Sequence, residues 1–524
     1  MKYFSADGAV GCGMKNAPEF RTCEQLLRHM DRLGVSRSLV YSVQARDQHP
    51  ATGNRKLLRE IESLDPEWKR LVPALVIAPT MLYERGTMEE LLGIMRQGRL
   101  RALRVFPGAL SHRLHHLEPL LELLLPFKPA LFLEVCEVKD DRDIIALAER
   151  FPALPIVCVG AMWPQIFNFS LLDLMRRCPN IHTEISWMHT PTIGGFAEQY
   201  GASRVLFALG TQAQAGAAMA GLAYAGVSDA DRQAIACGNL ESLLGLDPTQ
   251  EAGVAVASIW RDFLAGTPPT RDIVDAHGHL GGAGVWAIRE PDTRRQAADA
   301  VRTMDRLGVR TFIVSGFDAL SSDPIEGNLM LEKETEAQGA RIRGYLAFNP
   351  FYADQLVPRL DDFFSRPFFV GFKLLCDYWG VPVTDSRFEP AYAYANAHRL
   401  PVLVHTWSGP FDSPKMLEGV VRKHPQASFL LAHCGGSDAG RREAEELAMA
   451  NENVCLEWCG SFCAHRLWER TLEKVGSDKV IYGSDALGHD MAWELGRLLS
   501  LDVPAAKLTP ILGDNMRRVL ARRI

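Results

Sequence analysis

The sequence predicts two tandem (β/α)8 barrels, and three observations lead to this fold class. The hexapeptide MDRLGV occurs at residues 30–35 and again at residues 304–309, and similar segments follow both copies in the same order. Each half alternates short apolar segments with longer amphipathic ones, as buried parallel strands alternate with crossover helices. Eight such strands per half, in a chain of 524 residues, fit the usual barrel size of about 250 residues. A doubly wound open sheet is the alternative.

The predicted strands of the two halves correspond in order along the chain. The corresponding pairs are residues 5–11 and 275–281, 36–43 and 310–316, 71–79 and 342–350, 100–108 and 369–377, 130–135 and 401–406, 154–160 and 428–434, 180–186 and 453–459, and 204–210 and 479–485. We therefore predict an internal duplication. The first barrel is expected at 1–265, a linker at the Pro/Gly-rich GTPPT of 266–270, and the second barrel at 271–524.

Composition excludes several classes of protein. With 47% hydrophobic and 23% charged residues, the chain is typical of a soluble globular protein. The net charge of −6 makes nucleic acid and anionic membranes poor partners. The sequence contains no uncharged apolar run of about 18 residues, so we expect no membrane-spanning helix. The N-terminal residues do not resemble a signal peptide. The 11 cysteines form no CxxC pair, so we expect reduced thiols and a cytoplasmic location.

Polar residues with metal-binding chemistry lie at the predicted strand ends of the second half. Reactive groups of such barrels lie at the carboxyl ends of the strands. Each residue alone has a structural explanation, such as a core histidine, an ion-paired lysine or an aspartate that caps a helix. Together, nitrogen and carboxylate ligands around one axis suit Zn²⁺ or a similar divalent ion. The residues are His277, His279, Lys373, His405, His433 and Asp485.

The same segments carry a family resemblance. The motifs DAHGHL, GFKLL, PVLVHTW, LLAHCGG, VIYGSDA and ILGDNMRRVL resemble the amidohydrolase superfamily, in the amidohydrolase-2 branch near aminocarboxymuconate-semialdehyde decarboxylase and related metal-dependent hydrolases. The resemblance covers about 271–524 and reaches the first half only through the repeat. It implies a (β/α)8 barrel with a divalent metal, most simply Zn²⁺, at its C-terminal mouth.

The resemblance also implies roles for the candidate residues. Many relatives bind one metal, and binuclear relatives bind two that are bridged by a carbamylated lysine. Lys373 matches the position of that lysine. His433 would be either a ligand of the second metal or an acid–base group. The implied ligands of the first metal are His277, His279, His405 and Asp485.

The first half lacks all of these residues. We therefore predict that the first barrel binds no metal and is catalytically silent, with Arg104 and Glu134 forming an ion pair in the space of the metal. In the same order as the six candidates above, the opposite residues are Asp7, Ala9, Arg104, Glu134, Val159 and Gly210.

Other polar residues are shared by the two halves. Glu457 corresponds to Glu184, and Asn515 corresponds to Asn239. Because a half without a metal site keeps both, we expect these four residues to serve the fold.

The predicted function is hydrolysis of a small cyclic or carboxylated substrate, such as an amide or lactone, by metal-activated water. Asp485 would act as general base, and His433 would polarise the scissile carbonyl or donate a proton. Non-oxidative decarboxylation is the alternative, and Lys373 favours hydrolysis over it. A third reading is a non-catalytic binding or scaffold protein.

Further residues and partners complete these expectations. A small-molecule substrate would contact residues near the mouth, and we expect neither nucleic acid nor membrane to bind. We predict that the two barrels pair within the chain as a pseudo-dimer, with further homo-oligomerisation open. The expected substrate contacts are Trp407, Tyr378, Trp379 and Arg289.

Overall fold

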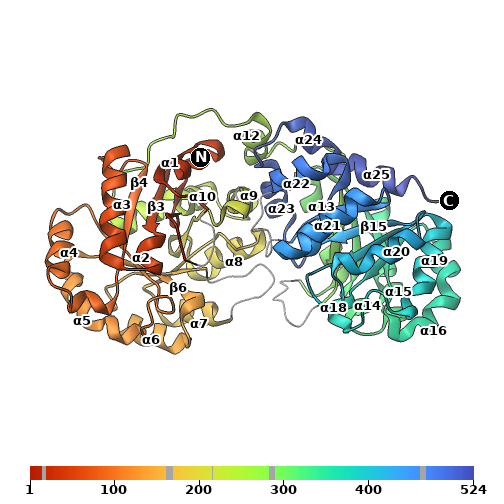
Figure 1. Cartoon of the computed structure of the whole chain (residues 1–524), viewed down its shortest axis with the longest axis horizontal. Helices are drawn as coiled ribbons and strands as arrows, with labels where there is room; N and C mark the ends of the chain where they lie inside the picture. The colour runs from red at the N-terminus through yellow and green to blue at the C-terminus, as the bar shows by residue number, and fades with distance from the viewer. Residues whose placement is uncertain (15–18, 161–168, 215, 283–289, 461–467) are drawn as a thin grey trace. The chain divides into compact units, whose positions relative to one another are not determined.

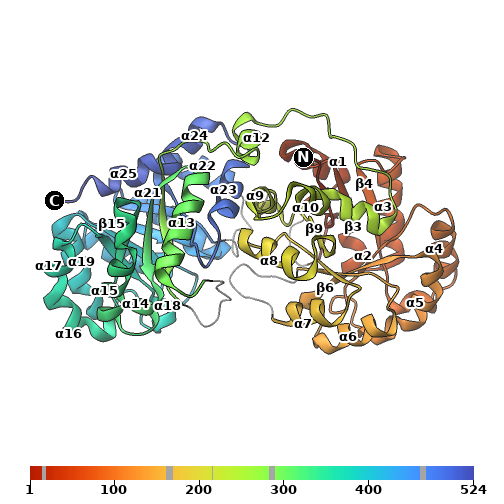
Figure 2. The same cartoon turned by 180° about the vertical axis from the view of Figure 1, so that it is seen from behind.

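The computed structural model describes residues 1–14, 19–160, 169–214, 216–282, 290–460 and 468–524. The chain divides into two compact units, Met1–Arg261 and Asp262–Ile524. The predicted linker at 266–270 lies a few residues beyond this division. In each unit the helices surround the strands, as Figures 1 and 2 show from opposite sides.

The first unit is a parallel barrel with eight strand positions. Its first position is split into β1 and β2, which both pair with β3. Ala6 N–H donates to Phe207 O at 2.8 Å and joins the first strand position to the last. The strands are β1 (Phe4–Ser5), β2 (Ala9–Val10), β3 (Arg37–Ser42), β4 (Leu71–Val76), β5 (Ala102–Val105), β6 (Ala130–Glu134), β7 (Ile156–Val159), β8 (Ile181–Glu184) and β9 (Val205–Leu206).

The helices of the first unit follow these strands in the expected alternation. They are α1 (Cys23–Leu33), α2 (Val43–Asp47), α3 (Pro50–Leu64), α4 (Thr87–Arg96), α5 (Glu118–Leu124), α6 (Asp141–Arg150), α7 (Phe169–Arg177), α8 (Thr190–Tyr200), α9 (Ala217–Tyr224), α10 (Asp229–Gln233), α11 (Asn239–Leu244) and α12 (Ser258–Leu264). The last of them crosses the division between the units.

The second unit is a barrel of eight parallel strands in sequence order. Asp485 N–H donates to His277 O at 2.7 Å, and a bridge between Gly278 and Ala486 closes the sheet beyond β17. The strands are β10 (Ile273–Leu280), β11 (Val309–Gly316), β12 (Ile342–Ala347), β13 (Phe369–Leu374), β14 (Pro401–His405), β15 (Ser428–Ala432), β16 (Val454–Trp458) and β17 (Val480–Tyr482). The prediction of two tandem (β/α)8 barrels is thus confirmed.

Helices again cover the outside of this barrel. They are α13 (Thr293–Leu307), α14 (Phe317–Ser321), α15 (Pro324–Thr335), α16 (Ala353–Leu356), α17 (Leu360–Ser365), α18 (Cys376–Trp379), α19 (Glu389–His398), α20 (Glu418–Lys423), α21 (Asp438–Ala450), α22 (Trp468–Val475), α23 (Met491–Leu499), α24 (Ala505–Thr509) and α25 (Asn515–Leu520). Within the described residues, no helix has the length and apolar character to cross a bilayer.

The amino-terminal end of each barrel is sealed in the same way. Leu240 and Leu244 of α11 pack into the core of the first unit, and Met516 and Val519 of α25 pack into that of the second. One π-helical turn, Ala234–Gly238 or Pro510–Asp514, precedes each of these helices. This repeated detail supports the predicted duplication.

The two shared asparagines make the same contacts in both units. Asn239 Nδ2 donates to Ala202 O and Val205 O, both at 2.8 Å. Asn515 Nδ2 donates to Ser477 O at 2.8 Å and Val480 O at 2.7 Å. Each asparagine therefore satisfies carbonyl groups next to the last strand, which confirms the expected role in the fold.

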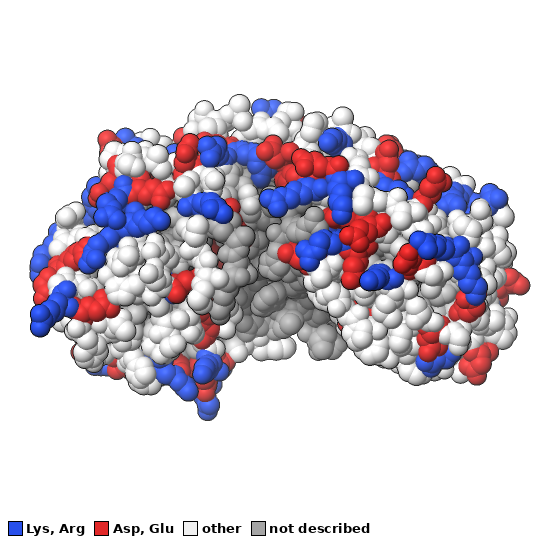
Figure 3. All heavy atoms as spheres, viewed as in Figure 1, with Lys and Arg blue, Asp and Glu red and all other residues white. Residues whose placement is uncertain are grey.

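Charged side chains are mixed over the visible surface. On the face shown in Figure 3, basic and acidic residues alternate over short distances on both units. The described residues on this face form no extended basic patch, such as a nucleic-acid-binding surface would present.

We expect Asn515→Ala to lower the free energy of unfolding by about 1–3 kcal/mol, because two buried carbonyls lose their donor. Urea unfolding of the full chain measures this loss. Asn396→Ala removes only an exposed contact to the Gln426 N–H and is the matched control. Equal unfolding midpoints for the two variants would contradict the assigned role.

Candidate metal centre

The histidine pair at the end of β10 is held at the closure of the barrel. His277 and His279 lie two residues apart in a strand, so their side chains leave the same face. Between them, a Cβ on Gly278 would lie 2.0 Å from the Phe312 ring and 2.8 Å from Ala486 O. Only glycine therefore fits between the two histidines.

Three predicted ligands come together in one buried group. The candidate ligand atoms of His277, His279 and Asp485 all lie within 4.8 Å of one another. Asp485 Oδ1 is 3.1 Å from His279 Nε2 and 3.5 Å from His277 Nε2. Two nitrogens and one carboxylate oxygen form a donor set that suits a divalent ion such as Zn²⁺ or Mn²⁺. The residues present thus fit the implied metal.

Hydrogen bonds to the opposite ring nitrogens orient the two imidazoles. His277 Nδ1 lies 3.1 Å from Glu457 Oε2, and His279 Nδ1 lies 3.0 Å from Ser315 Oγ. Such partners fix the tautomer, leaving Nε2 free to bind a metal, and make the ring a better ligand. Neither Glu457 nor Ser315 was predicted as part of the site.

The protonation states agree with metal binding. Burial, together with neighbouring Lys373, lowers the pKa of His277 well below its usual range. Burial also lowers the pKa of His279. Burial alone would raise the pKa of Asp485, but the facing imidazoles hold it well below its usual range. Neutral imidazoles beside an ionised carboxylate are the forms in which these groups bind a metal.

His405 and His433 stand beside this group. The ring centres of His405 and His433 are 4.9 Å apart, and that of His433 is 5.2 Å from His277. Asp412 Oδ2 lies 2.7 Å from His405 Nδ1 and fixes the ring. His405, a predicted ligand, lies outside the three-residue group, so its role as a ligand stays a prediction.

Lys373 points at the cluster. Its Nζ lies 2.6 Å from His277 Nε2, and the side chain is buried. Burial lowers the pKa of Lys373. The carboxylates of Asp485 and Glu457 act against this lowering, so an interaction with nearby carboxylates, the alternative explanation for this residue, stays open.

The predicted substrate residues have different surroundings. The Trp407 ring stacks on His405 with an interplanar angle of 9°, and the Tyr378 ring meets His405 edge-on. Trp379 donates from Nε1 to Leu320 O at 2.9 Å and stacks on Phe388, so its role as a substrate contact stays a prediction. Arg289 lies outside the described residues.

Glu457 does more than the sequence predicted. Glu457 accepts a hydrogen bond from His433 N–H at 3.2 Å, just after the sixth strand of its barrel. In the first unit, Glu184 accepts from Gly160 N–H at 3.0 Å at the corresponding place. This contact serves the fold as expected. The contact of Glu457 with His277 Nδ1 was not expected, and it makes Glu457 a part of the candidate site.

Two further groups escaped the sequence analysis. Cys459 Sγ lies 3.3 Å from His433 Nδ1 and 3.1 Å from Glu457 Oε2. With His277 and His433, this thiol forms a second group of potential ligands. Asp275 accepts from Ser484 Oγ at 2.5 Å and Ser484 N–H at 2.9 Å, and burial raises its pKa to about 7. Asp275 is the first residue of the DAHGHL motif, and its place in this motif could have identified it from the sequence.

An ion-pair cluster fills the corresponding place in the first unit. Arg104, 1% exposed, lies 2.7 Å from Glu134 Oε2 and 3.5 Å from Asp7 Oδ1 through Nη2. The guanidinium also lies over the rings of Tyr41 and Phe106. The predicted pair is confirmed, with Asp7 as a third member. No group of potential metal ligands is found among the described residues of this unit.

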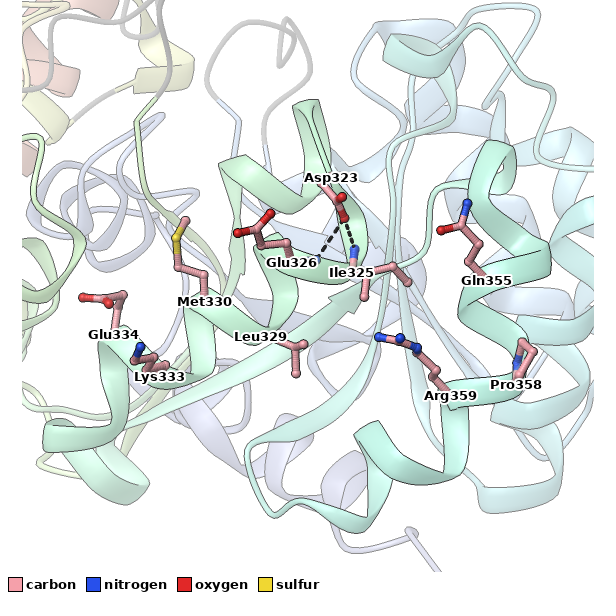
Figure 4. A pocket seen from close by; sticks show the side chains of 10 residues that line it. All are labelled: Asp323, Ile325, Glu326, Leu329, Met330, Lys333, Glu334, Gln355, Pro358 and Arg359. Atoms are coloured by element: carbon pink, nitrogen blue, oxygen red, sulfur yellow. Dashed lines mark hydrogen bonds between the residues drawn. The ribbon is translucent and has the colours of Figure 1, made fainter.

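A surface cavity of about 800 Å³ lies away from the cluster, along α15 and the segment after α16 (Figure 4). Ile325, Leu329 and Met330 line it beside charged groups such as Lys333 and Arg359. These residues come from outer helices and bear no relation to the strand ends, so the cavity is no part of the candidate centre.

Comparison with known proteins identifies the family. A family model described as amidohydrolase matches residues 274–522, the part of the chain that carries the cluster. The second unit belongs to the amidohydrolase family. A search among curated proteins found no match.

Solved structures similar to the chain include two decarboxylases. A dihydroxybenzoic acid decarboxylase from Polaromonas, with bound manganese, is 16% identical, with a TM-score of 0.37, covering 48% of this chain and 96% of its own. The 5-carboxyvanillate decarboxylase from Sphingomonas paucimobilis is 12% identical, with a TM-score of 0.38, covering 48% and 99%. An amidohydrolase 2 from Bifidobacterium longum is 15% identical, with a TM-score of 0.36, covering 48% and 98%.

We expect the full chain to bind divalent metal through the second unit alone. Asp485→Asn should remove most of the bound metal, because one of three converging ligands loses its charge. Asp7→Asn, at the corresponding place in the first unit, is the control and should leave the metal content unchanged. Elemental analysis after dialysis measures both. Metal lost from the Asp7 variant, or kept by the Asp485 variant, would contradict this assignment.

We expect Arg104→Met to destabilise the first unit by about 1–3 kcal/mol, because Glu134, which is only partly exposed, loses its counter-charge. Burial already raises the pKa of Glu134. An acid whose pKa is raised in the folded state costs stability as it ionises with rising pH. The destabilisation by Arg104→Met should therefore be larger at about pH 8, where Glu134 is ionised, than at about pH 5. Denaturant unfolding measures it.

The double variant Arg104→Met/Glu134→Leu is the control for this experiment. It removes both charges of the closer pair and leaves only Asp7, which is partly exposed, so we expect it to recover part of the lost stability. A double variant as unstable as the single one would show that the charge pair is not what Arg104 contributes.

Proposed function

We propose that the second unit is a metal-dependent decarboxylase of an aromatic or unsaturated carboxylic acid. The carrying observation is the composition of the cluster: two imidazoles and one carboxylate converge, and the Lys373 ammonium group lies beside them. A divalent ion held by His277, His279 and Asp485 would leave a net positive, buried site, which favours an anionic substrate.

Aromatic rings around the cluster support a flat substrate. Trp407 stacks on His405, and Tyr378, 69% exposed, projects beside the same ring. Phe317 stacks on His279, with ring centres 4.9 Å apart. Rings of this kind bind planar, unsaturated ligands through their faces and edges.

The residues of the chain can be given roles in this reaction. Lys373 would hold the substrate carboxylate by charge. The bond between the carboxylate carbon and the substrate carbon breaks, CO₂ leaves, and the electron pair stays on the substrate carbon. His433 would deliver the proton that this carbon takes up, and water would restore that proton. A bound divalent ion supplies positive charge that orients the substrate and stabilises the electron pair.

Hydrolysis remains the second candidate because of one specific observation. Lys373 faces the cluster at 2.6 Å from His277 Nε2, and the family resemblance matches it to the lysine that is carbamylated in binuclear relatives. A second metal held there would favour hydrolysis of an amide or lactone. For the metal itself we propose Zn²⁺ first and Mn²⁺ second, since both accept nitrogen and oxygen ligands.

We expect the metal-loaded full chain to release CO₂ from hydroxylated benzoates. Such a compound gives the similar dihydroxybenzoic acid decarboxylase its name. A coupled CO₂ assay, with absorbance of the aromatic product, measures the reaction, and cyclic amides and lactones are tested in parallel. Hydrolysis products without CO₂ would replace this proposal by the second candidate. Activity unaffected by a chelator would contradict both.

Asp485→Asn and His433→Asn should each lower the rate by at least about 10²–10⁴, because each removes a group at the reacting centre. His398→Asn changes a histidine of α19 that stacks on Tyr394, away from the cluster, and should leave the rate unchanged. The same assay on all three proteins, with circular dichroism as a check of folding, decides the point. Near-normal activity of His433→Asn would assign the proton to another group.

A further inference from the structure

We infer that Glu494 is a positioning residue that holds two loops of the candidate metal site together, an inference that rests on the proposed metal-dependent function. Glu494 lies on α23, the helix that follows β17, and is fully buried. Glu494 is not itself one of the three converging ligands, nor one of the predicted substrate residues. Its contacts instead reach the segment after β16 and the segment after β17.

The first contact ties Glu494 to the segment after β16. Gly460 N–H donates to the Glu494 carboxylate. Gly460 follows Cys459, whose thiol lies 3.3 Å from His433 Nδ1 and 3.4 Å from His277 Nδ1. A Cβ on Gly460 would itself come within 2.7 Å of His433 Nδ1, so this backbone lies against the site. Fixing Gly460 therefore fixes the groups that pack on both histidines.

The second contact ties the same carboxylate to the loop that carries Asp485. His489 Nδ1 lies 3.6 Å from Glu494 Oε1. The backbone N–H of His489 donates to Asp485 O at 2.7 Å and closes the turn in which Asp485 stands. The other oxygen of Glu494 lies 2.7 Å from Arg497 Nη1, which holds the carboxylate in place.

Backbone geometry explains why these loops need support. Asp485 has a φ of 54° and His433 a φ of 61°, in the left-handed region that non-glycine residues avoid. Such conformations persist only where the surroundings fix them strongly. A buried carboxylate that accepts a hydrogen bond from Gly460 and faces His489 of the second loop supplies that constraint next to a ligand and to the proposed proton donor.

The first unit provides a comparison within the same chain. Its helix α9 follows the last strand β9, as α23 follows β17, but α9 has the sequence AAMAGLAY and carries no charge. The shared residues Glu184 and Asn239 show that the first unit keeps the polar groups required by the fold. The charges of α23 are therefore associated with the unit that has the metal ligands, and not with the barrel as such.

The test is Mn²⁺ binding by the full chain, measured from the electron paramagnetic resonance signal of free Mn²⁺. We expect Glu494→Gln to weaken binding several-fold, because the segments that carry Asp485 and pack on His433 lose a shared contact. Glu445→Gln is the matched control. Glu445 is an equally buried glutamate, bonded to Thr471 Oγ1 at 2.8 Å and Lys474 Nζ at 3.1 Å, and its variant should bind within twofold of the unchanged chain.

A second variant keeps the test decisive if Glu494→Gln does not fold. His489→Gln leaves Glu494 paired with Arg497 and replaces the imidazole that faces Glu494 from the Asp485 turn, so it should also weaken Mn²⁺ binding at least several-fold. Folded variants that bind Mn²⁺ as tightly as the unchanged chain would overturn the inference. An unchanged chain that binds no Mn²⁺ would instead contradict the proposed metal site itself.

Discussion

The backbone seam between β10 and the segment after β17 determines where the candidate ligands meet. His277 and His279 end the first strand of the second barrel, and Asp485 follows the last, more than two hundred positions later in the sequence. The hydrogen bond from Asp485 N–H to His277 O, at 2.7 Å, brings the carboxylate to the imidazoles. Asp275 reinforces the seam by accepting two hydrogen bonds from Ser484. The hydrogen bonds that close the barrel thus also bring the candidate ligands together.

The fold and the ligands could be predicted because both leave local signals. Apolar segments at regular intervals predict parallel strands, and the repeated hexapeptide indicates two copies of one unit. The histidine pair and Asp485 stand at strand ends, where the barrel architecture alone brings them together. The contacts of Glu457, Cys459 and Glu494 could not be predicted in this way. They join side chains from different strands and a helix, and no spacing in the sequence encodes such contacts.

The two units carry different buried charged groups at the mouth of the same kind of barrel. In the second unit, buried imidazoles are held neutral and face a carboxylate, which suits a divalent cation. In the first, the guanidinium of Arg104 supplies the positive charge permanently, balanced by Glu134 and Asp7. A built-in cation needs no metal, which gives a physical reason for the prediction that the first barrel is catalytically silent. The pairing of the two barrels as a pseudo-dimer stays a prediction, as does the part that the first barrel plays.

X-ray absorption spectroscopy of the zinc-loaded full chain tests the central claim most directly, because it reports which atoms bind the metal. The account predicts nitrogen and oxygen neighbours at about 2.0–2.1 Å, with the scattering pattern of histidine rings. A sulfur neighbour at about 2.3 Å would place the metal on the group of Cys459, His277 and His433 instead. That result would contradict the assignment of His277, His279 and Asp485 as the metal ligands.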